Sequence, residues 1–258
     1  MVIVEHRRFE TAGADRRLHI WLPEGYENSE ERYPVMYFFD GHNLFSDNTA
    51  TYGKSWGLAE FLARWHRQMI LVGIECSHEG NERLIEYCPY DYRGKFWGEI
   101  HGTGKETLRF ITEELKPEMD GRFRTYSFRE ATGIGGSSMG GLMALYGVCM
   151  HNEIFSKAAC LSSAVGPGMK ELMRDIAAAP MSPDTRIYLS WGEKEALFGR
   201  KAQTDPLLTK TAQNHYLLSG LLGQKGCSTE VYLQPAGQHC EADWEKQVPY
   251  FMDYLWDR

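Results

Sequence analysis

From about residue 35 onward, the chain alternates short apolar runs with segments of helical period, and this order limits its fold more than any other feature. Short apolar runs of this kind are typical of strands buried on both faces. Strands that are separated by helices of about ten residues form βαβ units, and hence a mostly parallel sheet with helices on both faces. The pattern predicts strands at 35–39, 69–74, 131–135, 157–161, 186–191 and 229–233, and helices at 58–65, 107–115, 142–150, 169–178, 212–222 and 244–256.

The residues before this alternation are expected to form strands without intervening helices. Residues 17–22 alternate apolar and polar side chains, and a polar turn follows at 23–32. Two or three leading strands of this kind predict an antiparallel edge on the parallel sheet. No repeat or Pro/Gly/Ser-rich linker interrupts the chain, so we expect a single domain that spans residues 1–258.

Composition excludes several classes of partner. The 258 residues carry 28 Lys and Arg against 35 Asp and Glu, a net charge of −7, which argues against nucleic acid because phosphate binding requires a surplus of cations. The longest apolar run, 69–74, is far short of the roughly 20 residues that span a bilayer. Residues 1–8 lack the layout of a signal peptide, so the sequence favours a cytoplasmic protein with no membrane partner and leaves a homo-oligomer open.

The cysteines do not suggest a metal centre. None of the six forms a CxxC pair, and the segment Cys76-Ser77-His78 has no second ligand pair at zinc-like spacing. We therefore expect no metal site and no cofactor.

One glycine-rich segment carries a candidate nucleophile. The expected strand at 131–135 leads into Gly136-Ser137-Ser138-Met139-Gly140, which fits the G-x-S-x-G turn between a strand and a helix. Only Ser138 has glycine on both sides at a distance of two residues. Side chains at those positions would collide where strand and helix close together. The alternative is a tightly packed glycine turn without chemistry.

A serine hydroxyl needs a general base and an orienting acid, which should follow later strands. His239 is the best candidate of nine histidines, because it follows the expected strand 229–233 and precedes the last helix. The strand at 186–191 leads into Gly192-Glu193-Lys194-Glu195, and either glutamate could orient the imidazole. We prefer Glu195, three residues past the glycine; the alternative is that both glutamates are solvated.

The oxyanion of an acyl-transfer reaction needs two N–H donors. Met139 begins the helix after Ser138, so its N–H is one candidate. The strand at 35–39 ends in Asp40-Gly41-His42-Asn43, which offers the N–H of His42 as the second, with Asp40 anchoring the loop.

Taken together, the ordered motifs resemble an esterase family of α/β-hydrolases that includes esterase D, feruloyl and acetyl-xylan esterases and trilactone siderophore esterases. The motifs are Asp40-Gly41, Gly136-x-Ser138-x-Gly140, Gly192-x-x-Glu195 and Gly237-x-His239. Residues 83–89 are similar to the family's Arg…Glu-Tyr-x-Pro segment, and residues 239–244 to its closing His-x-x-x-x-Trp.

The resemblance implies an α/β-hydrolase fold and a serine carboxylesterase that forms an acyl-enzyme through Ser138, His239 and Glu195. Its substrate would be a small-molecule or oligosaccharide ester, with feruloyl or acetyl esters of plant polysaccharide sugars as the leading candidates. The alternatives are an intracellular siderophore-trilactone or S-formylglutathione hydrolase, and a catalytically silent binding protein with this fold. The aromatic segment 87–97 could line a substrate pocket or pack on the body, and Arg83 and Glu86 could form a structural ion pair.

Overall fold

The structure is a computed structural model, and it describes residues 1–10, 13–94, 98–196 and 205–257. Its strands are β1 Val2–Phe9, β2 Ala14–Trp21, β3 Val35–Phe39, β4 Ile70–Ile74, β5 Tyr92–Gly94, β6 Gly98–Ile100, β7 Thr132–Ser137, β8 Lys157–Leu161, β9 Arg186–Gly192 and β10 Ser228–Gln234. Its α-helices are α1 Leu58–Leu62, α2 Glu82–Glu86, α3 Gly104–Arg109, α4 Lys116–Arg122, α5 Met139–Met150, α6 Met169–Ala178, α7 Glu193–Ala196, α8 Lys210–Gln224, α9 Glu241–Glu245 and α10 Val248–Trp256.

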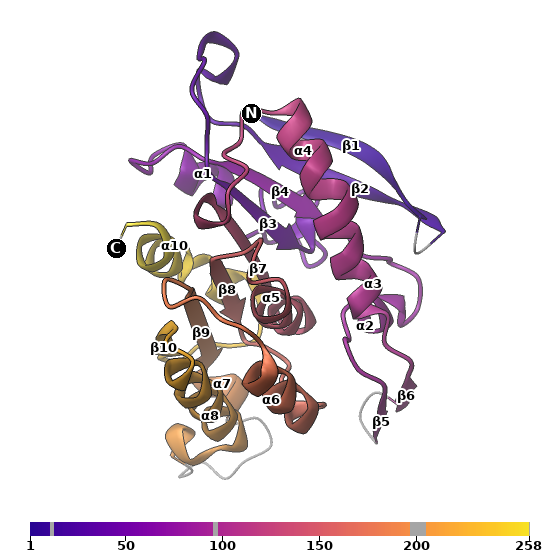
Figure 1. The fold of residues 1–258 in the computed structure, drawn as a ribbon, viewed down its shortest axis with the longest axis vertical. Coiled ribbons are helices and arrows are strands. Elements are labelled where there is room, and N and C mark those ends of the chain that lie inside the picture. Colours follow the sequence, from indigo (N-terminus) through magenta and orange to yellow (C-terminus); the bar gives the residue numbers. More distant parts are fainter. Residues whose placement is uncertain (11–12, 95–97, 197–204, 258) are drawn as a thin grey trace.

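Eight strands form one sheet in the order β1-β2-β4-β3-β7-β8-β9-β10 (Figure 1). The pairs from β4–β3 to β9–β10 are parallel, whereas β1–β2 and β2–β4 are antiparallel. The predicted mostly parallel sheet with an antiparallel N-terminal edge is therefore confirmed. Parallel strands bring their carboxyl ends to one edge, where ligands bind in folds of this type.

Helices cover both faces of this sheet, as predicted. Alternate residues of β3 lie in different hydrophobic clusters, because successive side chains of a strand point to opposite faces. Tyr37 packs in a cluster with residues of α3, α5, α6 and α8. Met36 and Phe38 pack in another cluster with residues of α1 and α10. All five residues of β3 are buried, as expected for a central strand between two layers.

Several predicted elements have different bounds in the structure. The helix expected at 107–115 is part of a longer one, in which α3 continues through a π-helical turn, Phe110–Leu115, into α4. The helix expected at 244–256 is divided into α9 and α10, and Pro249 stands in the first turn of α10 where its missing N–H has no cost. The short elements α2, β5 and β6 had no clear periodicity in the sequence.

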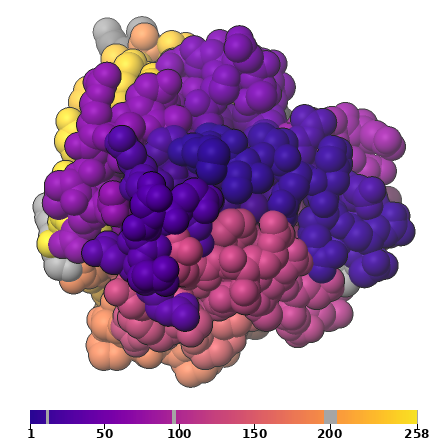
Figure 2. Space-filling model, turned by 90° about the horizontal axis from the view of Figure 1, so that it is seen from above, coloured from indigo at the N-terminus to yellow at the C-terminus, as the bar shows by residue number. Residues whose placement is uncertain are grey.

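The N-terminal hairpin packs beside α4, as Figures 1 and 2 show from two directions. Two ion pairs join them: Arg122 donates to Glu5, at 2.6 Å, and Arg7 lies 2.5 Å from Glu118. Among the described residues, no helix is both long and apolar enough to cross a membrane.

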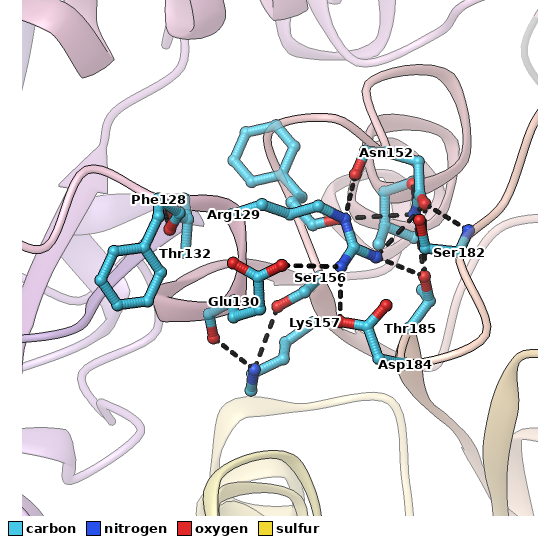
Figure 3. Close-up of polar contacts among 12 residues, drawn as sticks. Phe128, Arg129, Glu130, Thr132, Asn152, Ser156, Lys157, Ser182, Asp184 and Thr185 are labelled. Atoms are coloured by element: carbon cyan, nitrogen blue, oxygen red, sulfur yellow. Dashed lines mark hydrogen bonds and ion pairs between the residues drawn. The ribbon is translucent and has the colours of Figure 1, made fainter.

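A polar network joins the amino ends of β7, β8 and β9, at the edge opposite to Ser138 (Figure 3). The Arg129 guanidinium donates to the Asp184 carboxylate at 2.6 Å and to the Thr185 hydroxyl at 2.7 Å. The Asn152 amide donates to the same hydroxyl at 3.0 Å. In the same close-up, the Lys157 ammonium donates to the carbonyl of Glu130 at 2.6 Å. These groups fix the strand starts and are separate from the candidate site.

Candidate active site

Ser138 stands in the sharp turn between β7 and α5. Its φ of 57° and ψ of −120° are rare for a residue with a side chain and cost about 1–3 kcal/mol. The surrounding backbone holds this conformation: the Ser138 N–H donates to the Leu161 carbonyl at 2.9 Å, and the Ser138 carbonyl accepts from Ala164 N–H at 2.9 Å. Ser138 is partly exposed, whereas the competing Ser137 is buried in β7. The geometry is that of a nucleophile elbow.

The glycines on either side of Ser138 are required by close packing. A Cβ atom on Gly136 would lie 2.7 Å from the carbonyl of Gly140, and one on Gly140 would lie 2.9 Å from the Cβ of Phe39. Both distances are too short for carbon atoms. Gly136 thus reflects the contact between strand and helix that the sequence predicted, whereas Gly140 is required by its packing against Phe39 of β3.

Glu195 and His239 are joined by a hydrogen bond of 2.5 Å between Glu195 Oε2 and His239 Nδ1. The other carboxylate oxygen, Oε1, accepts from the Ser162 hydroxyl at 2.7 Å and from the Gly192 N–H. Burial by itself would raise the pKa of Glu195, but the hydrogen bonds and the charge of His239 lower it below its usual value. Glu193, the alternative acid, instead accepts from Ala236 N–H at 2.8 Å.

Two further residues, Trp244 and Ser162, support this pair, and sequence reasoning missed Ser162. The Trp244 indole N–H donates to Ser162 Oγ at 2.9 Å, so the Ser162 hydroxyl is left to donate to Glu195. The Trp244 ring also packs edge-on against the His239 imidazole, with centroids 5.1 Å apart. The His-x-x-x-x-Trp spacing pointed to Trp244, but Ser162 follows β8 without any motif that could have revealed it.

The loops that carry Glu195 and His239 are in direct backbone contact. A Cβ atom on Gly192 would lie 2.4 Å from the carbonyl oxygen of Gly237, and that oxygen accepts from the Lys194 N–H at 2.8 Å. Only glycine at position 192 allows this approach, which sets the distance between the acid and the imidazole.

Two N–H groups are placed near the Ser138 turn as candidate oxyanion donors. Met139 is the first residue of α5, where an N–H has no acceptor within the helix. His42 lies in a 3₁₀ turn, Gly41–Asn43, and likewise comes too early for an acceptor within that turn. The two segments adjoin, because Asp40 Oδ2 lies 3.3 Å from where a Gly140 Cβ would stand. Gly41 packs on Gly73 so tightly that a Cβ there would be 2.5 Å from the Gly73 carbonyl carbon.

The structure therefore brings together the predicted acid and base, and places Ser138 in a strained turn at the same sheet edge. Among the described groups, none is hydrogen-bonded to the Ser138 hydroxyl. Hydrogen bonds of this kind are often long in the absence of substrate and shorten in the substrate complex.

Comparison with known proteins assigns the family. The family model described as "Putative esterase" matches residues 10–251. The chain belongs to this esterase family. It is therefore an enzyme, a serine esterase that hydrolyses carboxylic esters. The esterase is 25% identical to the uncharacterized protein YbbA of Bacillus subtilis (strain 168) over 214 residues. The matched region covers 81% of this chain and 80% of YbbA.

Solved structures share the fold of the esterase at low sequence identity. An IroE-like serine hydrolase from Shewanella oneidensis superimposes with a TM-score of 0.75 at 20% identity, over 99% of this chain and 79% of that one. A ferulic acid esterase superimposes with a TM-score of 0.66 at 16% identity, over 99% of this chain and 97% of that one. The predicted α/β-hydrolase fold is confirmed by these matches.

Asp40, which is buried, anchors the loop before His42 in the esterase through an ion pair with the partly exposed Arg83. Arg83 donates to both oxygens of Asp40, at 2.8 and 2.7 Å. Burial would raise the pKa of Asp40, but the Arg83 guanidinium outweighs this effect and lowers it. The ion pair between Arg83 and Glu86 that the sequence suggested is not formed, because Glu86 pairs with Arg16 on β2.

The aromatic segment after β4 packs largely on the body of the esterase. The Tyr87 ring is buried against Phe39, with centroids 4.9 Å apart. The Tyr90 ring contacts Tyr146, and its hydroxyl donates to Asp175 at 3.0 Å. These rings fill space in the core and between elements. Residues 95–97 of the segment lie outside the described residues, and Tyr92–Gly94 forms β5, which pairs with β6 and extends from the body in Figure 1.

Proposed function

We propose that the protein hydrolyses carboxylic esters through an acyl-enzyme on Ser138, with His239 as general base and acid and Glu195 as the orienting carboxylate. The observation that supports this assignment best is the hydrogen bond that His239 Nδ1 donates to Glu195. An ionised Glu195 favours the tautomer with its proton on Nδ1, so that Nε2 carries a lone pair for the serine proton.

The proposed reaction has two acyl-transfer steps. His239 Nε2 removes the proton from Ser138 Oγ, which attacks the ester carbonyl and forms a tetrahedral oxyanion. The N–H groups of Met139 and His42 stabilise that oxyanion, and His239 returns its proton to the departing alcohol. A water molecule, deprotonated by His239, then attacks the acyl-enzyme and releases the acid and free Ser138.

For the substrate, we propose feruloyl or acetyl esters of plant polysaccharide sugars. This choice is supported by the sequence resemblance and by a shared fold with a ferulic acid esterase. The partial exposure of Ser138 and of His239, whose side chain is 44% exposed, is consistent with a site open to a bulky alcohol group.

A fluorophosphonate probe tests the nucleophile, because it forms a covalent adduct with an activated serine. We expect one adduct, located at Ser138 by mass spectrometry. The variant Ser138→Ala should lose the label and at least about 1,000-fold of its kcat/KM for p-nitrophenyl acetate. Ser137→Ala serves as the matched control and should retain both. Hydrolysis that survives in Ser138→Ala would refute the assignment.

A panel of methyl ferulate, an acetylated xylo-oligosaccharide, S-formylglutathione and a catecholate trilactone tests the substrate. The proposal requires the highest kcat/KM for one of the first two. A clear preference for the thioester or the trilactone would replace it with one of the two alternatives that the sequence left open, while the serine mechanism would stand.

A further inference from the structure

Three side chains outside the proposed catalytic trio come together beyond the ends of β3 and β4. His42, Glu75 and His78 each offer one ligand atom, and within the described part of the chain these three atoms lie within 4.8 Å of one another. Because β3 and β4 are parallel neighbours with Phe39 opposite Ile74, the residues after each strand emerge side by side. His42 and His78 are in contact, with ring centroids 4.7 Å apart.

One nitrogen of the His42 imidazole has no partner among the residues that the structure describes. His42 is only 6% exposed, and its Nε2 is hydrogen-bonded to the Thr51 hydroxyl at 2.9 Å. Its Nδ1 is buried and has no hydrogen-bond partner in the described part of the chain. An unsatisfied buried polar atom costs about 1–3 kcal/mol of stability. Such an atom therefore indicates a functional role, for example in binding an ion.

The two carboxylate oxygens of Glu75 have different partners, an arrangement that suits metal ligation. Oε1 is bound on the protein side by His19 Nε2, at 2.6 Å, and lies 3.6 Å from the Arg17 guanidinium. Oε2 faces His78 Nε2 at 3.3 Å. Ligating carboxylates in metalloproteins are typically held by such an outer hydrogen bond, which fixes their orientation. His42 has an equivalent outer contact from Thr51.

We propose that His42 Nδ1, Glu75 Oε2 and His78 Nε2 bind a divalent transition-metal ion of the zinc type. Two imidazoles and one carboxylate form a common three-ligand set for zinc, in which water occupies the fourth position. Nitrogen ligands disfavour Mg²⁺ and Ca²⁺, which prefer oxygen.

The ligand atoms must approach one another slightly to bind the ion. Ligands at about 2.1 Å from a tetrahedral zinc are about 3.4 Å apart. His78 can supply this movement by side-chain rotation, because its side chain is 57% exposed while those of Glu75 and His42 are buried. The sequence favoured no metal site because the segment around Cys76 has no second ligand pair at zinc-like spacing. In the proposed site, His42 follows a different strand, β3.

Metal binding can be measured directly on the chelator-treated, intact protein. Titration with Zn²⁺ in a calorimeter should show one site, and Co²⁺ should give a visible spectrum of nitrogen and oxygen ligands without a thiolate charge-transfer band. His78→Ala should weaken Zn²⁺ binding at least about 100-fold, since outer contacts alone account for 10–100-fold in known sites. Glu75→Gln should weaken it as well.

His66→Ala is the matched control, because His66 is also an exposed histidine and pairs with Asp257 away from this cluster. This variant should bind Zn²⁺ as the wild type does. The proposal is overturned if wild-type protein binds no Zn²⁺ at millimolar concentration, if His78→Ala binds equally well, or if cobalt shows thiolate ligation. None of these readouts uses ester hydrolysis, so either proposal can fail without the other.

Discussion

Glu195 binds His239 with one carboxylate oxygen and the body of the protein with the other. Oε2 accepts from the imidazole at 2.5 Å, while Oε1 accepts from Ser162 and from the Gly192 N–H. The carboxylate is thus oriented by three donors, which lie at or beyond the ends of three strands, β8, β9 and β10. Glu193, two residues earlier in the chain, instead accepts a hydrogen bond from the Ala236 N–H.

This difference predicts unequal effects for two matched substitutions. Glu195→Gln should lower kcat by about 10²–10⁴-fold, because a neutral amide no longer favours the reactive tautomer of His239. Glu193→Gln should change kcat less than about threefold. Steady-state kinetics with p-nitrophenyl acetate measure both; similar losses in the two variants would contradict the proposed role of Glu195.

The strained backbone of Ser138 predicts a gain in stability when the side chain is removed. Ser138→Gly should increase the free energy of unfolding by about 1 kcal/mol, because glycine adopts positive φ without steric cost. The same variant should have no measurable esterase activity. Urea unfolding is the measurement, and Ser138→Ala, which keeps a Cβ atom, is the control that should show no such gain.

The ion pair between Arg83 and the buried Asp40 carboxylate should contribute far more to stability than an exposed pair. Arg83→Met leaves the Asp40 carboxylate buried without its partner and should lower the free energy of unfolding by about 3–5 kcal/mol. Arg93→Met breaks a comparable contact with Glu99, but the Arg93 side chain is 80% exposed, so the loss should be under about 1 kcal/mol.

A second substitution separates loss of charge pairing from loss of packing. In the Arg83→Met background, Asp40→Asn removes the unpaired charge and should recover part of the stability. If the double variant is as unstable as Arg83→Met, the charge of Asp40 does not explain the effect.

The lowered pKa of Lys157, a residue of the network in Figure 3, predicts that stability depends on pH in the alkaline range. Burial lowers the pKa of Lys157 from 10.5 to about 8, despite contacts that favour the charge. Between these values the unfolded chain binds more protons than the folded one, so this group increases the free energy of unfolding as pH rises. Below pH 8 both states are protonated, and the full cost of burying the ammonium lowers the free energy of unfolding.

Lys157→Met should remove this contribution. Relative to the variant, the wild type should gain on the order of 1–2 kcal/mol in unfolding free energy between pH 7.5 and 10, after allowance for partial exposure. Other titrating groups are common to both proteins and cancel in the comparison. The exposed Lys170→Met is the control, and a wild-type advantage that stays constant with pH would contradict the prediction.

The sequence predicts a strand or a site residue of this protein when the residues that determine it lie close together in the chain. Strands β3 and β7 were predictable because buried parallel strands are continuous apolar or glycine-rich runs. Ser138 was predictable because the glycines that its turn requires lie within the five residues 136–140. Glu195 could be preferred over Glu193 but not assigned, since the choice depends on how the loop after β9 meets the loop after β10.

Long-range contacts were out of reach of such reasoning. Ser162 supports Glu195 through a contact with Trp244, 82 residues away, and no periodicity or motif marks that relation. The partner of Arg83 was misjudged for the same reason: Glu86 is near it in the sequence, but Asp40 is near it in space. The cluster of His42 with Glu75 and His78 likewise depends on the order of strands in the sheet.

The contact between Gly192 and Gly237 has a consequence for engineering. The spacing of the acid and the imidazole is set by two main-chain segments that touch, without any side chain acting as a spacer. The acid–imidazole spacing therefore does not depend on the β5–β6 hairpin, which belongs to a different part of the chain. In contrast, a single methyl group added at position 192 would separate the two loops and impair turnover on every ester alike.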